Sequence, residues 1–133
     1  MYRRTLIGFV FCLLLAGCAR MTAQRLTSER LAATDRLYAS FEFDRIHLAV
    51  TLHAALTAEG VAVAPSQAAA ELLLTGMYSA RYEERHYRFD WAELKLVRQK
   101  TGQVLLTMHT EYAGLQSVED MVHTMVAEIK HLY

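Results

Sequence analysis

The strongest constraint on the fold is a change of hydrophobic period along the chain, from two residues to about 3.6 and back to two. Residues 37–43 alternate apolar and polar side chains, which is typical of a half-buried strand. Residues 44–59 change to helical spacing, between Asp44 as a plausible N-cap and Gly60 as a helix-ending residue. The side chains expected on the inner face of this helix are Ile46, Ala49, Val50, His53 and Leu56.

The second half of the chain predicts three strands and a final helix. The strands are expected at residues 71–82, 87–98 and 103–112, with Gly102 in the short turn between the last two. Ser117 is a good N-cap for the helix, and Lys130 lies at its negative end. Its apolar stripe consists of Val118, Met121, Val122, Met125, Val126, Ile129 and Leu132.

The element order is therefore strand, helix, strand, strand, strand, helix, and it predicts an α+β fold. Two amphipathic helices are buried most simply when both pack on one face of a single sheet, here a mixed sheet of about four strands. The first two strands, joined through a helix, are expected to be parallel. The later strands form antiparallel hairpins, and residues 35–133 make one domain.

Composition excludes several classes of protein. The chain has 133 residues, 53% of them hydrophobic, with 14 basic and 14 acidic residues. This content suits one globular domain and argues against a disordered or collagen-like chain. A formal net charge of zero provides no basic surface for nucleic acid, so no nucleic-acid partner is expected.

The first 17 residues have the organisation of a secretory signal peptide. Arg3 and Arg4 form a positive n-region, and an almost uninterrupted apolar run follows at residues 6–16. That run is well below the roughly 20 residues that cross a bilayer as a helix. The alternative is an uncleaved N-terminal anchor helix in which Cys18 is an ordinary thiol.

The end of this segment, Leu15-Ala16-Gly17-Cys18, resembles the lipobox of bacterial lipoproteins. The resemblance implies that Cys18 is lipidated and becomes the N-terminus, with residues 18–34 as a tether. Two or three acyl chains anchor a protein stably, whereas one chain binds only marginally. Ala19 replaces the Asp that commonly signals inner-membrane retention, which implies the outer membrane, facing the periplasm. In a Gram-positive source, the same motif would imply the outer face of the single membrane.

Processing would also change the chemistry of the chain. Cys12 leaves with the signal peptide, so no thiol remains for a disulfide, a metal site or a nucleophile. Loss of Arg3 and Arg4 leaves 12 basic against 14 acidic residues. A weakly negative body is not attracted to anionic lipids, so the acyl chains alone are expected to hold it at the membrane.

Two strings in the globular part have a familiar pattern. They are Ala-Ala-Glu-Leu-Leu-Leu-Thr-Gly-Met-Tyr at 69–78 and Leu-Val-Arg-Gln-Lys-Thr-Gly-Gln-Val at 96–104. With the element order, they resemble the small α+β domain of TolB amino-terminal regions, LpoB and CsgG-type envelope lipoproteins. Glu71 stands where these proteins usually have Asp. The resemblance implies a non-catalytic envelope protein that binds another protein, and it carries over no functional residue.

Motifs for catalysis or cofactor binding are absent from the sequence. It contains no hydrolase elbow, no P-loop, no dinucleotide fingerprint and no His-Glu-x-x-His helix. The weak metal-ligand pairs are His47 with His53, His86 with His109, and Glu119 with His123. No metal site and no cofactor is predicted. Glycoside chemistry would need paired carboxylates from Glu83, Glu84 and Asp90 around a cleft, and so compact a domain leaves little room for one. No enzymatic activity is therefore expected.

The segment 87–98 contains two apolar sets of opposite parity. Tyr87, Phe89 and Trp91 form one set, whereas Ala92, Leu94 and Leu96 form the other. A β-bulge near residues 92–93 would turn both sets toward the helices. A regular strand would instead leave the three aromatic residues on the open sheet face, where they would be a candidate partner surface.

The sequence thus favours a lipid-anchored envelope protein that acts as an accessory or assembly factor by binding an envelope protein. A carrier or chaperone of a lipid or glycolipid is the alternative hypothesis. A large pocket between the helices and the sheet would favour that alternative.

Overall fold

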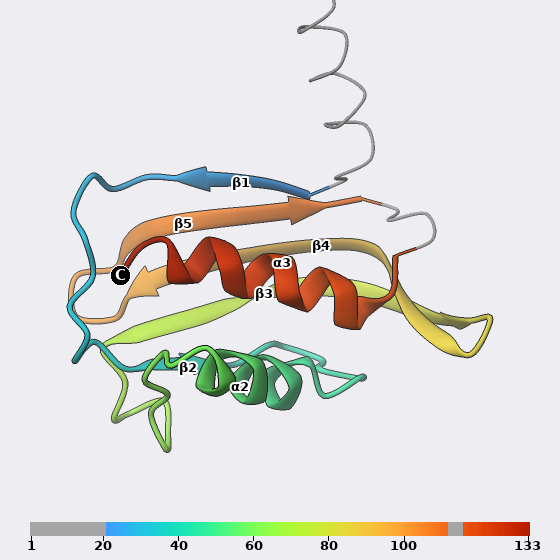
Figure 1. The fold of residues 1–133 in the computed structure, drawn as a ribbon, viewed down its shortest axis with the longest axis horizontal. Coiled ribbons are helices and arrows are strands. Elements are labelled where there is room, and N and C mark those ends of the chain that lie inside the picture. The colour runs from blue at the N-terminus through green and yellow to red at the C-terminus, as the bar shows by residue number, and fades with distance from the viewer. Residues whose placement is uncertain (1–20, 112–115) are drawn as a thin grey trace, which may run out of the picture.

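The computed structural model describes residues 21–111 and 116–133, which form one sheet and two helices (Figure 1). The strands are β1 (Met21–Arg25), β2 (Leu37–Ala39), β3 (Leu72–Glu83), β4 (His86–Arg98) and β5 (Gln103–Thr110). The helices are α2 (Leu48–Ala58) and α3 (Val118–Lys130). Every predicted element is present, but the first predicted strand ends at Ala39 instead of Phe43 and the helix after it begins at Leu48 instead of Asp44. β1 is additional.

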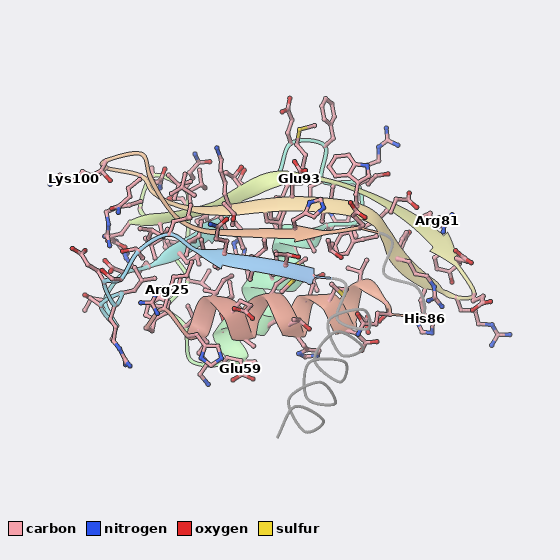
Figure 2. All side chains as sticks on the ribbon, turned by 90° about the horizontal axis from the view of Figure 1, so that it is seen from above. Arg25, Glu59, Arg81, His86, Glu93 and Lys100 are labelled. Atoms are coloured by element: carbon pink, nitrogen blue, oxygen red, sulfur yellow. The ribbon has the colours of Figure 1, made fainter. Side chains whose placement is uncertain are left out.

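The strand order in the sheet is β1-β5-β4-β3-β2. β2 and β3 are parallel, and the other neighbours are antiparallel. Both helices lie on the same face of the sheet, and the other, open face carries no helix of the described residues (Figures 1 and 2). The α+β prediction is therefore confirmed, with a mixed sheet of five strands.

β1 corrects the predicted start of the domain. Residues 21–25 were expected in a tether, but they pair with β5 from Met21 opposite Thr110 to Arg25 opposite Leu106. Leu31, from the same segment, is buried, and its N–H donates to the Leu132 carbonyl at 2.6 Å. The sequence signal was weak because β1 is short and only alternate side chains contact the core, so polar residues dominate it.

The start of α2 is tied to the sheet by Asp44. Its carboxylate accepts hydrogen bonds from the N–H groups of Leu48 at 2.6 Å and Ala49 at 3.1 Å. The Tyr78 hydroxyl, from β3, donates to the same carboxylate at 2.5 Å and accepts from the Ile46 N–H at 3.1 Å. Burial, followed by the hydrogen bond to Asp44, raises the pKa of Tyr78 to about 12. Asp44 therefore binds the first N–H groups of α2, but the N-cap residue is His47 rather than the predicted Asp44, because the helix begins only at Leu48.

The predicted inner face of α2 is rotated relative to the observed one. Leu48, Leu52 and Leu56 are the buried residues of this helix, whereas Val50 is 66% exposed. The predicted stripe assumed a helix beginning near residue 44, but residues 44–47 form the cap instead. By contrast, the predicted stripe of α3 is buried throughout, and Ser117 caps that helix through the Asp120 N–H at 3.2 Å.

The outer edge of β2 is covered by other parts of the chain. The Leu37 N–H donates to the Ala62 carbonyl, and the Leu37 carbonyl accepts from the Ala64 N–H, both at 2.9 Å. The Ala39 N–H donates to Nε2 of His53, on α2, at 2.8 Å. Burial lowers the pKa of His53, which favours the neutral imidazole that can accept this hydrogen bond. This edge is consequently closed to a further strand.

The start of β3 is joined to the start of β2 by Glu71. Its carboxylate accepts from the backbone N–H of Arg36 at 2.7 Å and from the guanidinium at 3.4 Å. The backbone hydrogen bond, more than the side-chain one, lowers the pKa of Glu71.

Gly76 is required where β3 passes β4. A Cβ added at this position would collide with the carbonyl oxygen of Glu93, which is opposite-strand backbone and has little freedom to move. We expect Gly76→Ala to lower the free energy of unfolding by at least about 2 kcal/mol, because of overpacking and strain. Chemical denaturation measures the change.

Gly60→Ala is the matched control, because Gly60 also has positive φ but nothing lies within 4 Å of an added Cβ. It should lose only about 1–2 kcal/mol, the cost of the left-handed conformation. Equal losses in the two variants would contradict the close approach at Gly76.

His53 should make stability depend on pH. In the unfolded chain His53 has a pKa near 6.5, whereas in the folded chain its pKa is lower. Between these two pKa values the unfolded state therefore binds more protons than the folded state. Stability should therefore fall as the pH drops below about 6.5. Denaturation across this range tests it, with His53→Gln as a comparison that still offers an acceptor to Ala39. The prediction fails if the two proteins lose stability in parallel.

Candidate functional site

The register of β4 contains a β-bulge at Asp90. Ser79 is opposite Trp91 and the next residue of β3, Ala80, is opposite Phe89, so Asp90 is the extra residue. A bulge was one of the two predicted arrangements, but it lies two residues before the predicted position. The extra residue changes which face Phe89 occupies relative to Trp91.

The three aromatic residues of the candidate surface are thereby separated. Phe89 is 0% exposed and packs edge-to-face on Tyr78 with ring centroids 5.7 Å apart, so it belongs to the core. Trp91 and Tyr87 are 38% and 47% exposed. Neither predicted arrangement is correct as a whole, because the bulge turns only Phe89 inward.

Tyr87 also lies apart from Trp91. It stacks edge-to-face on Tyr82 across the β3–β4 hairpin, with ring centroids 5.2 Å apart. The two tyrosines line a hollow of about 300 Å³ together with residues at the starts of α2 and α3, including Thr51 and Val118. Tyr87 therefore faces the helix side of the sheet, beyond the point where the helices cover it.

Trp91 lines a different hollow, on the sheet face that carries no helix. This open-face groove has a volume of about 580 Å³. Trp91 lies on β4 opposite Ser79, and Met77 lies two residues along β3, so the two side chains are diagonal neighbours on one face. Met77 is 50% exposed. The groove is lined by Gly76, Met77, Trp91, Glu93, Leu94, Lys95, Thr107, Met108 and His109.

Charged side chains surround this groove. Figure 2 shows Glu93 on the side of the sheet away from the helices, and its carboxylate lies 3.5 Å from Nδ1 of His109. Nε2 of His109 is 3.5 Å from the carboxylate of Glu111. Next to Trp91, the Asp90 carboxylate accepts from the Ser79 hydroxyl at 3.2 Å. An apolar centre with a polar rim is the usual anatomy of a protein-binding surface.

Met77 and Lys95 were missed by sequence reasoning. The signal that could have revealed Met77 is the alternation of side chains in residues 72–78. Leu74 is buried and Tyr78 packs against the core, and Met77 has the opposite parity, so its side chain lies on the other face of the sheet. An apolar side chain on the wrong parity of a strand is a candidate surface residue. This signal identifies a surface site only when the register of β4 against β3 is known, because the register decides whether Trp91 lies on the same face as Met77.

The carboxylates considered for glycoside chemistry form ion pairs. Arg81 lies 3.2 Å from both Glu83 and Asp90, and Glu84 lies 3.3 Å from Arg88. Arg81, Glu83 and Asp90 are all more than a third exposed. The pairs of Arg81 are therefore solvated, and in the remaining pair Arg88 is buried whereas Glu84 is exposed. None of this is an arrangement of two carboxyl groups facing each other across a cleft.

The histidine pairs considered as metal ligands are far apart or serve structural roles. His86 lies at the end of the β3–β4 hairpin, remote from Glu93 and its neighbour His109 (Figure 2). His53 accepts the backbone hydrogen bond from β2, and His47 is the residue before α2. Within residues 21–111 and 116–133, no three His, Cys, Asp or Glu side chains gather as a metal site.

The predicted signal peptide and Cys18 lie outside the described residues. Neither α2 nor α3, the helices of the described part, has the length and apolar character needed to span a membrane.

Comparisons with known proteins reveal similarity in structure alone. No family model and no curated protein matches the chain. The PelC dodecamer from Paraburkholderia phytofirmans is similar with a TM-score of 0.53 and 17% identity, over 82% of this chain and 94% of that one. A minor lipoprotein from Acinetobacter baumannii gives a TM-score of 0.42 and 14% identity, over 75% of this chain and 95% of that one. The first likeness shows a shared fold, and the second is too loose to carry an argument.

Phe89 and Trp91 should differ sharply in their effect on stability. Phe89→Ala is expected to lower the free energy of unfolding by about 3–5 kcal/mol, the range for truncation of a buried aromatic residue. Trp91→Ala should cost about 1 kcal/mol or less, because that side chain is on the surface. Urea denaturation of both variants measures the difference. A larger loss for Trp91→Ala than for Phe89→Ala would place the indole in the core and contradict the bulge at Asp90.

Proposed function

We propose that this chain is a lipid-anchored bacterial envelope protein that acts, without catalysis, as an accessory or assembly factor by binding an envelope protein through the open-face groove. The observation that carries the proposal is the exposed pair of Trp91 and Met77 in that groove. Large aromatic residues and methionine are enriched at the centres of protein interfaces. Methionine also adapts its shape to a partner.

The anchor is the lipobox-like end of the apolar segment, at Cys18. Because β1 begins at Met21, the link between the acylated residue and the folded domain spans three residues instead of the expected seventeen. Three extended residues reach at most about 11 Å. Lipidation at Cys18 would therefore hold the domain against the membrane surface, and Ala19 after the cysteine favours the periplasmic face of the outer membrane.

A lipid or glycolipid carrier is less well supported. Such a carrier needs an apolar cavity between the helices and the sheet. In the described part of the chain that space is filled by residues with no exposed surface, including Leu52, Leu96 and Ile129. The open-face groove lies on the other side of the sheet, and Glu93 and Lys95 are among its lining residues.

The test is cross-linking in intact cells, followed by capture of the tagged full-length protein and mass spectrometry. We expect one stoichiometric envelope protein, and we expect Trp91→Ala to weaken its capture at least about tenfold, as truncation of a central interface residue does. Tyr87→Ala is the matched control, since it removes an aromatic residue that is at least as exposed as Trp91 and lies on the helix side of the sheet.

Capture that is unchanged in Trp91→Ala, or reduced equally in Tyr87→Ala, would contradict the groove as the binding surface. Co-purification of lipid or glycolipid without a protein would favour the carrier instead. Recovery of further copies of this chain through the groove would point to self-assembly, of which the similar PelC dodecamer is an example.

A further inference from the structure

We propose that the outer edge of β1 is a self-association site, at which β1 of a second copy pairs antiparallel about Ala23 and continues the sheet across both molecules. This inference does not rest on the proposed function, because it concerns a different surface from the open-face groove. It follows from which backbone groups of β1 point outward and from the closure of the other sheet edge.

β1 is the terminal strand of the sheet, so one side of its backbone lies beyond the ladder (Figure 1). The Leu26 N–H donates to the Leu105 carbonyl, which directs residue 26 toward β5. In an antiparallel strand the backbone N–H and C=O groups of successive residues point alternately to the two neighbouring sides, so those of Thr22 and Gln24 also bond to β5. The backbone groups of Met21, Ala23 and Arg25 consequently face outward, and no described residue pairs with that side of the strand.

The sequence of β1 has few of the features that usually prevent edge pairing. It is Met-Thr-Ala-Gln-Arg, with no Pro and no Lys. Its one charge, Arg25, is at the end of the strand, where the guanidinium donates to the carbonyls of Thr27 and Glu29. Its pairing with β5 is regular over all five residues, with no bulge to twist the edge away.

The opposite edge of the sheet cannot receive this strand. Residues 62–64 and His53 already bond to the outer side of β2. A head-to-tail chain of sheets, β1 on β2, is therefore blocked, and only like-with-like pairing remains. An isologous contact of this kind closes as a two-fold dimer.

The residues of β1 are complementary to themselves in the two-fold register. With Ala23 opposite Ala23 of the second copy, Met21 lies opposite Arg25 and Thr22 lies opposite Gln24. No two like charges face each other, and the outward groups of Met21, Ala23 and Arg25 form about six backbone hydrogen bonds. Met21 and Ala23, which are only partly buried in one copy, would gain a neighbouring strand.

Cysteine cross-linking of the full-length protein in cells tests the register. In the proposed dimer the two Cα atoms at position 23 are about 5.5 Å apart, within the range for a disulfide. Ala23→Cys should therefore form a disulfide-linked dimer under mild oxidation. Gln24→Cys is the control, because its two copies are offset by two positions and lie beyond about 7 Å.

The wild-type protein, treated in the same way, accounts for Cys12 and Cys18. No cross-link at position 23, or equal cross-linking at 23 and 24, would overturn the proposal.

A second variant tests the edge without a cysteine. In Ala23→Pro the lost N–H faces outward, so the pairing of β1 with β5 loses no hydrogen bond and the fold should persist. We expect the detergent-solubilised wild-type chain to sediment as a dimer and Ala23→Pro to sediment as a monomer with an unchanged circular dichroism spectrum. A monomeric wild type, or a dimer that survives Ala23→Pro with its fold intact, would refute pairing at this edge.

Discussion

The register between β3 and β4 determines what each face of this molecule presents. These two long strands form the centre of the sheet, and the single extra residue at Asp90 changes the parity of β4. On one side of the bulge Phe89 joins the core, and on the other Trp91 remains on the open face. Without the extra residue, Phe89 and Ala92 would point to opposite faces, and one of them would be lost from the packing under the helices.

The rest of the fold attaches to the buried face that this register creates. Tyr78, on β3, contacts Phe89 through its ring and Asp44 through its hydroxyl, and Asp44 in turn caps α2. The helix then covers the β2 edge through His53. β3 therefore positions α2, and α2 helps to close the edge of the sheet at β2. β1 is left as the edge with outward-facing backbone groups.

Sequence patterns predicted the elements whose signal is local. The α3 stripe, the Ser117 cap and the β4–β5 turn at Gly102 each depend on residues close together in the chain, and each is found where it was expected. Asp44 was placed at the start of α2 for the same reason, and it binds the first N–H groups there although His47 is the N-cap.

What the sequence did not reveal depends on contacts between distant residues. β1 becomes a strand only because β5 offers it a partner more than eighty positions away. The position of the bulge depends on how β4 meets β3, and a one-residue error there reassigns Phe89. The exposed pair of Met77 and Trp91 requires both strands in register, so parity within one strand was insufficient to define the groove.

If Cys18 is lipidated as proposed, the two proposed surfaces constrain one another through that anchor. The two-fold axis of antiparallel β1 strands runs perpendicular to the sheet, so both acylated termini of a dimer would reach one membrane only if the sheet lies roughly parallel to it. A link of at most about 11 Å leaves little freedom to tilt away from that orientation. The open-face groove would then face either the membrane or the aqueous side. Because Glu93, Lys95 and His109 line it, burial of this face against lipid would desolvate charged groups without compensation. The helix face carries exposed Glu119, Asp120 and Lys130, so either face would lose hydration of charged groups against lipid. The proposed binding of a protein partner at Trp91 is what requires the groove to be on the aqueous side.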